Sequence, residues 1–206
     1  MRRTRWSGVL AILLLVGGCD DGPSSGGDGG ARRDGGGSSG TDAGGSSGTD
    51  AGMLPEMCAG GPLGAPVAGC RPAVLPSTGD VVQDCVNRIN QLRAECQCLP
   101  PLERWNEGES CGDQQAQYDS EMMRAHGGFS DRICSPSGRG QNECPGWGSE
   151  AQVISGCLQA MWDEGPGEPF SEHGHYINMT NPAHSRVACG FYTTPSGQVW
   201  AVQNFQ

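Results

Sequence analysis

The sequence predicts a disulfide-rich α+β domain preceded by an export signal and a linker. Patterns of three helices come first within the C-terminal part of the chain, and patterns of three short strands follow them. Ten of the eleven cysteines lie in the same part. Helices followed by a group of strands are typical of α+β folds, whereas α/β folds alternate the two.

The helices are predicted from the spacing of their apolar residues. Valine, isoleucine, leucine, methionine and cysteine recur at three- and four-residue intervals, as on one face of a helix. The second range is followed by Gly127–Gly128, which places His126 at a helix C-terminus. The three ranges are about 79–97, Ser110 to His126, and Ser149 to Glu164.

The strands are predicted from runs of β-branched and aromatic residues near the C-terminus. These runs are His175 to Thr180, Val187 to Tyr192 and Gln198 to Phe205. The turn residues Pro195-Ser196-Gly197 separate the last two runs, as in a hairpin. The pattern predicts an antiparallel meander.

The N-terminus has the pattern of a secretion signal. Three arginines precede an apolar stretch from Val9 to Val16, and two glycines and Cys19 follow. Val16-Gly17-Gly18-Cys19 resembles the lipobox of bacterial lipoproteins, which implies acylation of Cys19 and a membrane anchor. An ordinary signal peptide with an incidental Cys19 is the alternative. We expect a protein of the cell envelope, held outside the cytoplasm by its lipid.

Composition divides the rest of the chain. Residues 1–18 are the predicted signal, and 19–52 are a repeated Gly/Ser/Asp/Thr/Ala stretch that cannot build a core. As a flexible coil this linker reaches about 30 Å. Residues 53–78 are predicted to be an irregular leader held by disulfides, and 79–206 the folded domain.

The ten remaining cysteines are predicted to form disulfides, because their number is even and the chain is exported. Sequence leaves their pairing open. A zinc thiolate site at Cys96-Gln97-Cys98 is the alternative, but the spacing is unusual for zinc. The ten are Cys58, Cys70, Cys85, Cys96, Cys98, Cys111, Cys134, Cys144, Cys157 and Cys189.

Charge and hydropathy exclude two classes of function. A formal net charge of -10 repels phosphate backbones, so nucleic acid is not an expected partner. The only long apolar run is the N-terminal one, which excludes a multi-span membrane protein.

Several short motifs together resemble the CAP superfamily, the cysteine-rich secretory, antigen 5 and pathogenesis-related proteins. The resemblance covers about Val81 to Phe205. It implies an α-β-α sandwich, in which helices flank a small antiparallel sheet. Its motifs are Asn87-Arg88-Ile89-Asn90, Pro100-Pro101-Leu102 to Trp105, a helix ending in His126, Met161-Trp162-Asp163-Glu164, Gly174-His175-Tyr176 and Val187-Ala188-Cys189-Gly190.

The resemblance implies a cleft with two histidines and two glutamates that can hold a divalent cation. His126, His175 and Glu164 match three of these positions. The fourth is normally the Glu of a Gly-Glu-Asn motif, but this chain has Gln141 there, so Glu143 is the expected replacement, with Gln141 as the neutral alternative. Imidazole and carboxylate ligands suit Zn²⁺ better than Ca²⁺. The alternative is that both histidines only hydrogen-bond across the cleft.

Other polar and aromatic residues are interpreted as structural. Four tryptophans are expected in the core or at its rim, and five polar residues in solvated loops around the cleft. The tryptophans are Trp105, Trp147, Trp162 and Trp200, and the polar residues are Ser171, Glu172, His173, His184 and Ser185.

Three functions remain open at this level. We favour a non-enzymatic surface module that binds a small molecule, a lipid or a divalent cation, because no nucleophile motif is present. A metal-assisted hydrolase of peptides or envelope polymers, with Glu143 or Glu164 as base, is the second. A structural or defensive module with a vestigial cleft is the third.

Overall fold

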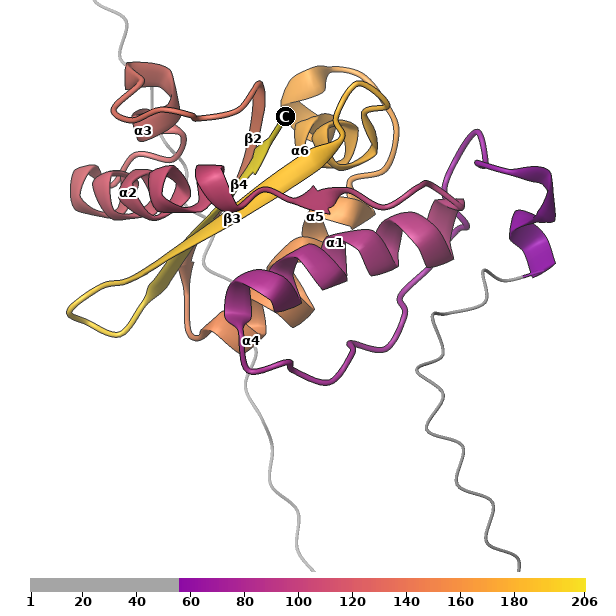
Figure 1. The fold of residues 1–206 in the computed structure, drawn as a ribbon, viewed down its shortest axis with the longest axis horizontal. Helices are drawn as coiled ribbons and strands as arrows, with labels where there is room; N and C mark the ends of the chain where they lie inside the picture. Colours follow the sequence, from indigo (N-terminus) through magenta and orange to yellow (C-terminus); the bar gives the residue numbers. More distant parts are fainter. Residues whose placement is uncertain (1–55) are drawn as a thin grey trace, which may run out of the picture. The chain divides into compact units, whose positions relative to one another are not determined.

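The computed structural model describes residues 56–206, so the predicted signal, Cys19 and the linker lie outside the described residues. Within this part, a four-stranded sheet has helices on both faces (Figure 1). The elements are η1 (Glu56–Gly60), α1 (Val81–Gln97), β1 (Glu103–Arg104), α2 (Asn106–Met122), α3 (Gly127–Asp131), β2 (Gly140–Trp147), α4 (Glu150–Gln152), the π-helical segment η2 (Val153–Cys157), α5 (Leu158–Asp163), α6 (Phe170–Thr180), β3 (Arg186–Thr193) and β4 (Val199–Phe205).

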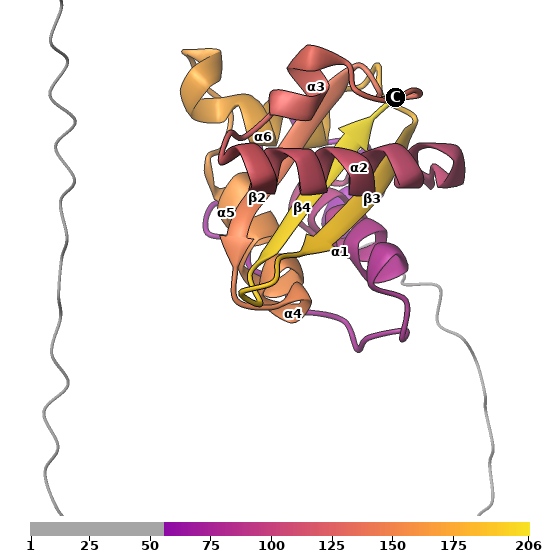
Figure 2. The ribbon, with the colours of Figure 1, turned by 90° about the vertical axis from the view of Figure 1, so that its left-hand side faces the viewer.

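The sheet has the order β1-β3-β4-β2. Strands β3 and β4 form the predicted hairpin, and β2 pairs antiparallel with β4. The short strand β1 is parallel to β3, so the sheet is mixed rather than purely antiparallel. Helix α2 covers one face and α1 lies on the other, as Figure 2 shows. The predicted disulfide-rich α+β fold is confirmed.

Helix α1 begins and ends close to the predicted limits. The Asp80 side chain accepts from the amides of Val82 and Gln83 and so caps its first turn. The helix ends at Gln97, followed by Cys98 in the left-handed region (φ 57°). Its buried face carries Val86, Ile89 and Leu92, which belong to the main core.

The second predicted helix differs from the structure at both ends. Helix α2 begins at Asn106, four residues before Ser110, and stops at Met122 because Met123 turns left-handed (φ 49°). Gly127–Gly128 therefore do not close it but open the short helix α3. His126 precedes α3 with φ 59°, so its prediction at a helix C-terminus was wrong.

The predicted strand from His175 to Thr180 is also wrong, because these residues belong to helix α6. Tyr176 and Met179 lie three residues apart and are buried. Tyr176 packs edge-on against Trp162 of α5 at 5.2 Å between ring centroids. The strand that completes the sheet is instead β2, which sequence did not predict.

Five disulfides join distant elements. Cys85–Cys189 ties α1 to β3, Cys111–Cys134 ties α2 to the segment after α3, and Cys144–Cys157 ties β2 to η2. Cys96 and Cys98 bond to Cys70 and Cys58 of the leader, so they are not a thiolate zinc site.

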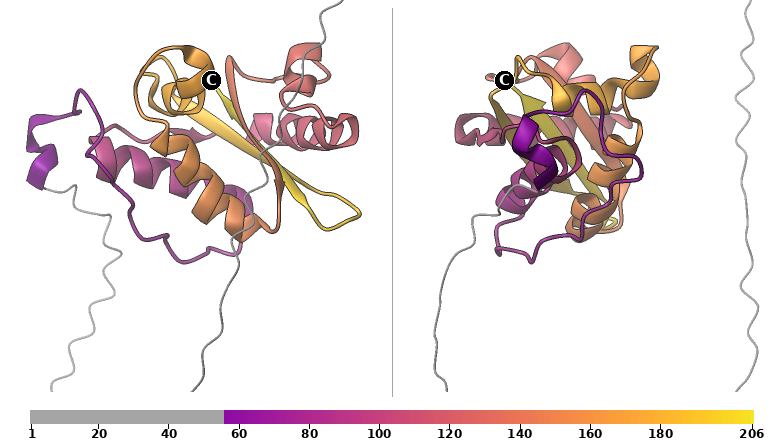
Figure 3. Two further views of the ribbon diagram at one scale, coloured as in Figure 1. Left: turned by 180° about the vertical axis from the view of Figure 1, so that it is seen from behind. Right: turned by 90° about the vertical axis from the view of Figure 1, so that its right-hand side faces the viewer.

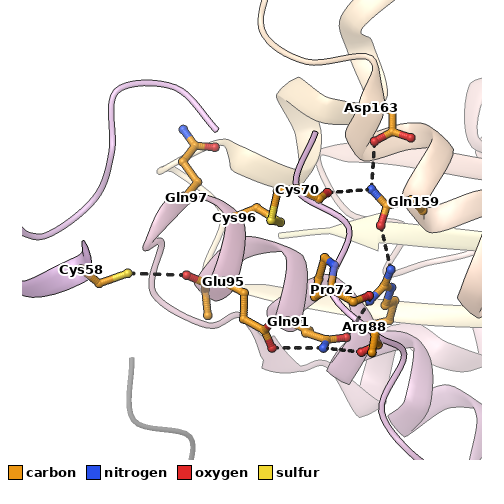
Figure 4. Close-up of a disulfide and its surroundings, with 12 residues drawn as sticks. Cys58, Cys70, Pro72, Arg88, Gln91, Glu95, Cys96, Gln97, Gln159 and Asp163 are labelled. Carbon is orange, nitrogen blue, oxygen red and sulfur yellow. Dashed lines mark hydrogen bonds between the residues drawn. A yellow bond between two sulfur atoms is a disulfide. The ribbon is translucent and has the colours of Figure 1, made fainter. Parts of the chain in front are cut away.

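The leader runs along α1 from its C-terminal end toward its N-terminal end (Figure 3). At the far end, Asp84 of α1 accepts from the Ser77 hydroxyl and from the amide and hydroxyl of Thr78. The leader has no strand or helix beyond η1 among its described residues. Its position depends on two disulfides and on side chains of the domain (Figure 4), and on backbone hydrogen bonds from Leu63 and Val67 to the end of α1.

Candidate functional site

Two of the predicted site residues, His126 and His175, meet at one end of the sheet. His126 lies in the turn before α3 and His175 lies on α6, and Figures 1 and 2 show both helices at this end. Their ring centroids are 6.3 Å apart, with an interplanar angle of 31°. Both side chains are part-exposed, at 40% for His126 and 33% for His175. A ligand from solvent can reach both rings.

Glu164 holds His175. One carboxylate oxygen lies 2.5 Å from the His175 Nδ1 atom, and the other accepts the His175 backbone amide at 3.0 Å. A carboxylate on Nδ1 favours the tautomer with its proton there. The Nε2 atom then carries the lone pair that can bind a ligand, and the carboxylate fixes the orientation of the ring.

Gln141 of β2 holds His126 in a similar way but without charge. Its Oε1 atom lies 2.8 Å from the His126 Nδ1 atom. Its Nε2 atom donates to Gln115 and Asn204, which determines the orientation of the amide. Nδ1 of His126 is therefore the donor, and its Nε2 atom also has a free lone pair.

Glu143 lies beneath this site rather than in it. Its side chain is completely buried, and one oxygen accepts the His126 backbone amide at 2.5 Å. Burial raises the pKa of Glu143 to about 8, and the nearby Asp119 carboxylate contributes. Burial also raises the pKa of Asp119, which accepts the Gly128 amide at 2.6 Å. Both carboxylates accept backbone amides, at His126 and at Gly128, and so hold the turn that carries His126.

Three of the four predicted ligand residues therefore gather, and Glu143 faces the interior. Within residues 56–206, no group of three His, Cys, Asp or Glu side chains is arranged to hold a metal ion. The donors that suit a borderline cation such as Zn²⁺ are the two imidazole Nε2 atoms, with Glu164 already bonded to His175. A bound cation stays a prediction.

The buried residues that support the two-histidine site were not predicted from the sequence. Asp119 and Gln115 are fully buried on α2, and Asn204 is fully buried on β4. The available signal is the position of Gln115, which lies four residues after Cys111 on the same face of α2. A polar residue on such a face indicates a buried hydrogen-bond network.

The residues expected in solvated loops have different environments. Ser171 and Glu172 are exposed but helical, Ser185 is exposed, and the His173 Nδ1 atom contacts the carbonyls of Glu164 and Gly165. His184 is buried and stacks on Phe205, so its predicted exposure was wrong. Three of the four tryptophans are buried in the core as predicted, and Trp147 packs at its rim.

Comparison with protein families identifies the domain. The model of the CAP, or cysteine-rich secretory protein, family matches residues 86–205, more than half of the chain. The chain belongs to the CAP family. The matched residues include His126, Gln141, Glu164 and His175, so the two-histidine site lies inside the CAP domain. No curated protein matches the sequence significantly.

The family and the disulfides indicate the same cellular compartment. Five disulfides and a CAP domain are features of an extracellular protein. In residues 56–206, no helix combines the length and apolar character that crossing a bilayer requires.

Proposed function

We propose that this CAP-domain protein is a non-enzymatic binding module of the cell surface that holds its ligand between His126 and His175. The main support is that two part-exposed imidazoles from distant elements lie close together, with ring centroids 6.3 Å apart. The Nδ1 atom of His126 contacts Gln141, and the Nδ1 atom of His175 contacts Glu164. In each ring this leaves the Nε2 lone pair available to bind a ligand. The simplest ligand of this kind is a divalent cation such as Zn²⁺, completed by water.

Isothermal titration of the full chain with Zn²⁺ tests this proposal. We expect one Zn²⁺ per chain, and we expect His126→Ala and His175→Ala each to weaken binding at least tenfold. His173→Ala is the matched control. His173 lies on the same helix as His175, but its Nδ1 atom is within hydrogen-bond distance of the Glu164 backbone carbonyl. Equal binding by all three variants would contradict the two-histidine site. Absence of binding would leave the cation proposal without support.

The geometry favours binding over hydrolysis. Of the two carboxylates proposed as base, Glu143 is completely buried and Glu164 bonds to His175. A general base must reach the proton it removes, and Glu143 cannot reach a substrate in this arrangement. Turnover of a peptide and ester panel that is lost with a chelator would overturn the non-enzymatic proposal.

We further propose that Cys19 anchors the chain to a membrane through covalent lipid. The support is the lipobox-like Val16-Gly17-Gly18-Cys19 after an apolar stretch, together with the extracellular character of the domain. Radiolabelled palmitate should label the wild-type chain but not Cys19→Ser in the producing cell. Equal labelling of both would contradict the anchor.

A further inference from the structure

His184 is a buried histidine whose ring makes no hydrogen bond within residues 56–206. It is 8% exposed, and neither its Nδ1 nor its Nε2 atom has a partner in that range. The ring stacks on Phe205 of β4, with centroids 5.6 Å apart. A phenylalanine would make the same stack without leaving a buried donor and acceptor unpaired, which is costly. What the imidazole adds is the ability to take up a proton near neutral pH.

The His184 ring lies where helix α6 meets the start of β2. A Cβ atom added at Gly140 of β2 would lie 3.3 Å from the His184 Nε2 atom and 2.9 Å from the Asn178 Oδ1 atom of α6. Neither Asn178 nor Phe205 carries a charge. Figure 1 shows the C-terminus, just after β4, at the end of the sheet where α6 lies. The ring is therefore at the same end of the sheet as the two-histidine site.

Asparagine side chains join α6 to β2 at this point. The Nδ2 atom of Asn178 donates to the Gln141 carbonyl at 3.1 Å and to the Asn142 side chain at 3.0 Å. Asn142 in turn donates to the His175 carbonyl at 3.0 Å. These contacts form the α6–β2 junction. It connects Gln141, which holds His126, to the helix that carries His175.

The charged groups that face His184 are cations. Arg139 approaches from the segment before β2, and Arg93 approaches from α1. Arg186, on the same segment as His184, lies instead over the Trp105 ring, 4.8 Å from its centroid. Burial, followed by Arg139 and Arg93, lowers the pKa of His184 below its usual 6.5. A proton on this ring would add a third cation and two donors to a buried position.

We infer that His184 is an acid-sensitive switch of the α6–β2 junction. While neutral, its ring fills the junction. Once protonated, the ring moves out toward water, and α6 and β2 separate at this end. Because the two elements carry His175 and the support of His126, this opening moves the two imidazoles apart. The effect on ligand binding rests on the proposed function, whereas the opening itself does not.

Urea unfolding of the full chain between about pH 7 and pH 5 tests the proton sensitivity. His184→Phe keeps the stack but takes up no proton. Since the unfolded chain binds the proton more readily, wild type should lose stability as pH falls below 6.5. We expect its unfolding equilibrium constant to rise, relative to that of His184→Phe, by up to about tenfold per pH unit. The contribution of Glu143 is the same in both proteins and cancels. A ratio that stays constant with pH would overturn the inference.

Arg139→Gln is a second variant, for the case in which phenylalanine does not fit. Arg139 is exposed, and its loss removes one of the two cations that face the ring. The rise of the unfolding constant below pH 6.5 should therefore be smaller than in wild type. Arg132→Gln removes a charge from an exposed position after α3 and should behave like wild type. Equal rises in the two arginine variants would contradict the role of Arg139.

Amide hydrogen exchange locates the opening. At about pH 5, protection at residues 140–142 and 175–180 should fall at least tenfold more in wild type than in His184→Phe, while protection of α1 changes equally in both. A uniform loss along the chain would show general destabilisation and would overturn the switch.

Titration with Zn²⁺ at the same two pH values tests the coupling to the two-histidine site. Affinity should fall in both proteins, because imidazole binds metal only when neutral, and at least threefold more in wild type than in His184→Phe. Equal losses would overturn the coupling. Absence of Zn²⁺ binding at pH 7 would contradict the proposed function, and the exchange measurement would still decide whether the junction opens.

Discussion

Gln141 is the residue whose chemistry most directly affects the two-histidine site. It has the same contact to His126 that Glu164 has to His175, but it supplies no charge. Its amide also donates to Gln115 and Asn204, so the surrounding network is built for an amide. The two imidazoles are therefore unequal ligands, because only His175 has a carboxylate on its Nδ1 atom.

Gln141→Glu should tighten Zn²⁺ binding about tenfold, because a carboxylate on Nδ1 strengthens Nε2 as a ligand. The same change should lower the free energy of unfolding by about 1–3 kcal/mol, since it places an acceptor against those of Gln115 and Asn204. Calorimetric titration and urea unfolding measure the two effects. Gln114→Glu adds the same charge at an exposed position of α2 and should change neither. Unchanged affinity in the Gln141 variant would count against His126 as a ligand.

Glu143 gives stability a defined pH dependence. The pKa of Glu143 is raised from 4.5 to about 8 in the folded chain, chiefly by burial. Between these values the folded chain binds more protons than the unfolded chain, so stability decreases as pH rises through this window. The contribution of this group is complete below the lower value and is lost as pH approaches the upper one.

Glu143→Gln should remove this decrease, because glutamine is neutral like protonated glutamate and keeps an oxygen for the His126 amide. Urea unfolding at several pH values between about 5 and 8 measures how steeply the free energy of unfolding decreases with pH. We expect the variant to be less steep by up to about 1.4 kcal/mol per pH unit. Glu107→Gln, at an exposed glutamate of α2, is the control and should keep the wild-type slope. The same slope in the Glu143 variant would contradict a raised pKa of the buried Glu143 carboxyl.

At the scale of elements, α2 packs unusually close to the sheet. Gly112 of α2 faces Gly190 of β3, and a Cβ atom added at Gly190 would lie 2.1 Å from the Gly112 carbonyl carbon. This contact is made by backbone on both sides, so neither partner can yield by changing a rotamer. Two glycines in α2, at 108 and 112, reduce helix propensity but permit this packing.

Gly190→Ala should therefore cost about 3 kcal/mol or more of unfolding free energy, or prevent folding. Chemical denaturation and the yield of correctly oxidised protein measure this. Gly64→Ala is the control, because its added Cβ would contact nothing within 4 Å, and we expect a change within about 0.5 kcal/mol. Equal stability of the two variants would show that α2 can move away from the sheet at little cost.

For the whole molecule, the disulfides connect the chain over very different distances. Cys85 and Cys189 are separated by 104 residues, and Cys144 and Cys157 by 13. A disulfide that closes a longer loop restricts the unfolded chain more, so the first pair should contribute more. The long bridge also joins helix α1 to the central hairpin.

Replacing Cys85 and Cys189 by alanine should cost about 2 kcal/mol more than replacing Cys144 and Cys157, from the loop-length dependence of chain entropy. Denaturant unfolding of the two double variants gives this difference directly. All four cysteines are buried, so the cavities left behind are comparable. Equal costs, or a larger cost for the shorter loop, would show that local strain or packing outweighs chain entropy.

Sequence alone predicted those features whose signal is local. Helix α1, the helical stretch after Ser149 and the β3–β4 hairpin follow from residue spacing, caps and turn residues. The presence of disulfides followed from the even cysteine count, and the CAP family followed from the order of short motifs. Each of these signals spans a few residues or depends only on the order of motifs along the chain. They can therefore be recognised without knowing how the elements pack.

Tertiary structure alone decided the rest, because long-range contacts outweighed local preference. His175 to Thr180 has strand-like residues, but packing of Tyr176 against Trp162 and burial of Met179 favour a helix. Strand β2 is polar and contains Gly and Pro, yet Gln141 and Asn142 are buried because partners from α2, α6 and β4 satisfy their amides. The direction of Glu143 depends in the same way on Asp119 and the His126 amide, which are distant in sequence and adjacent only in the fold.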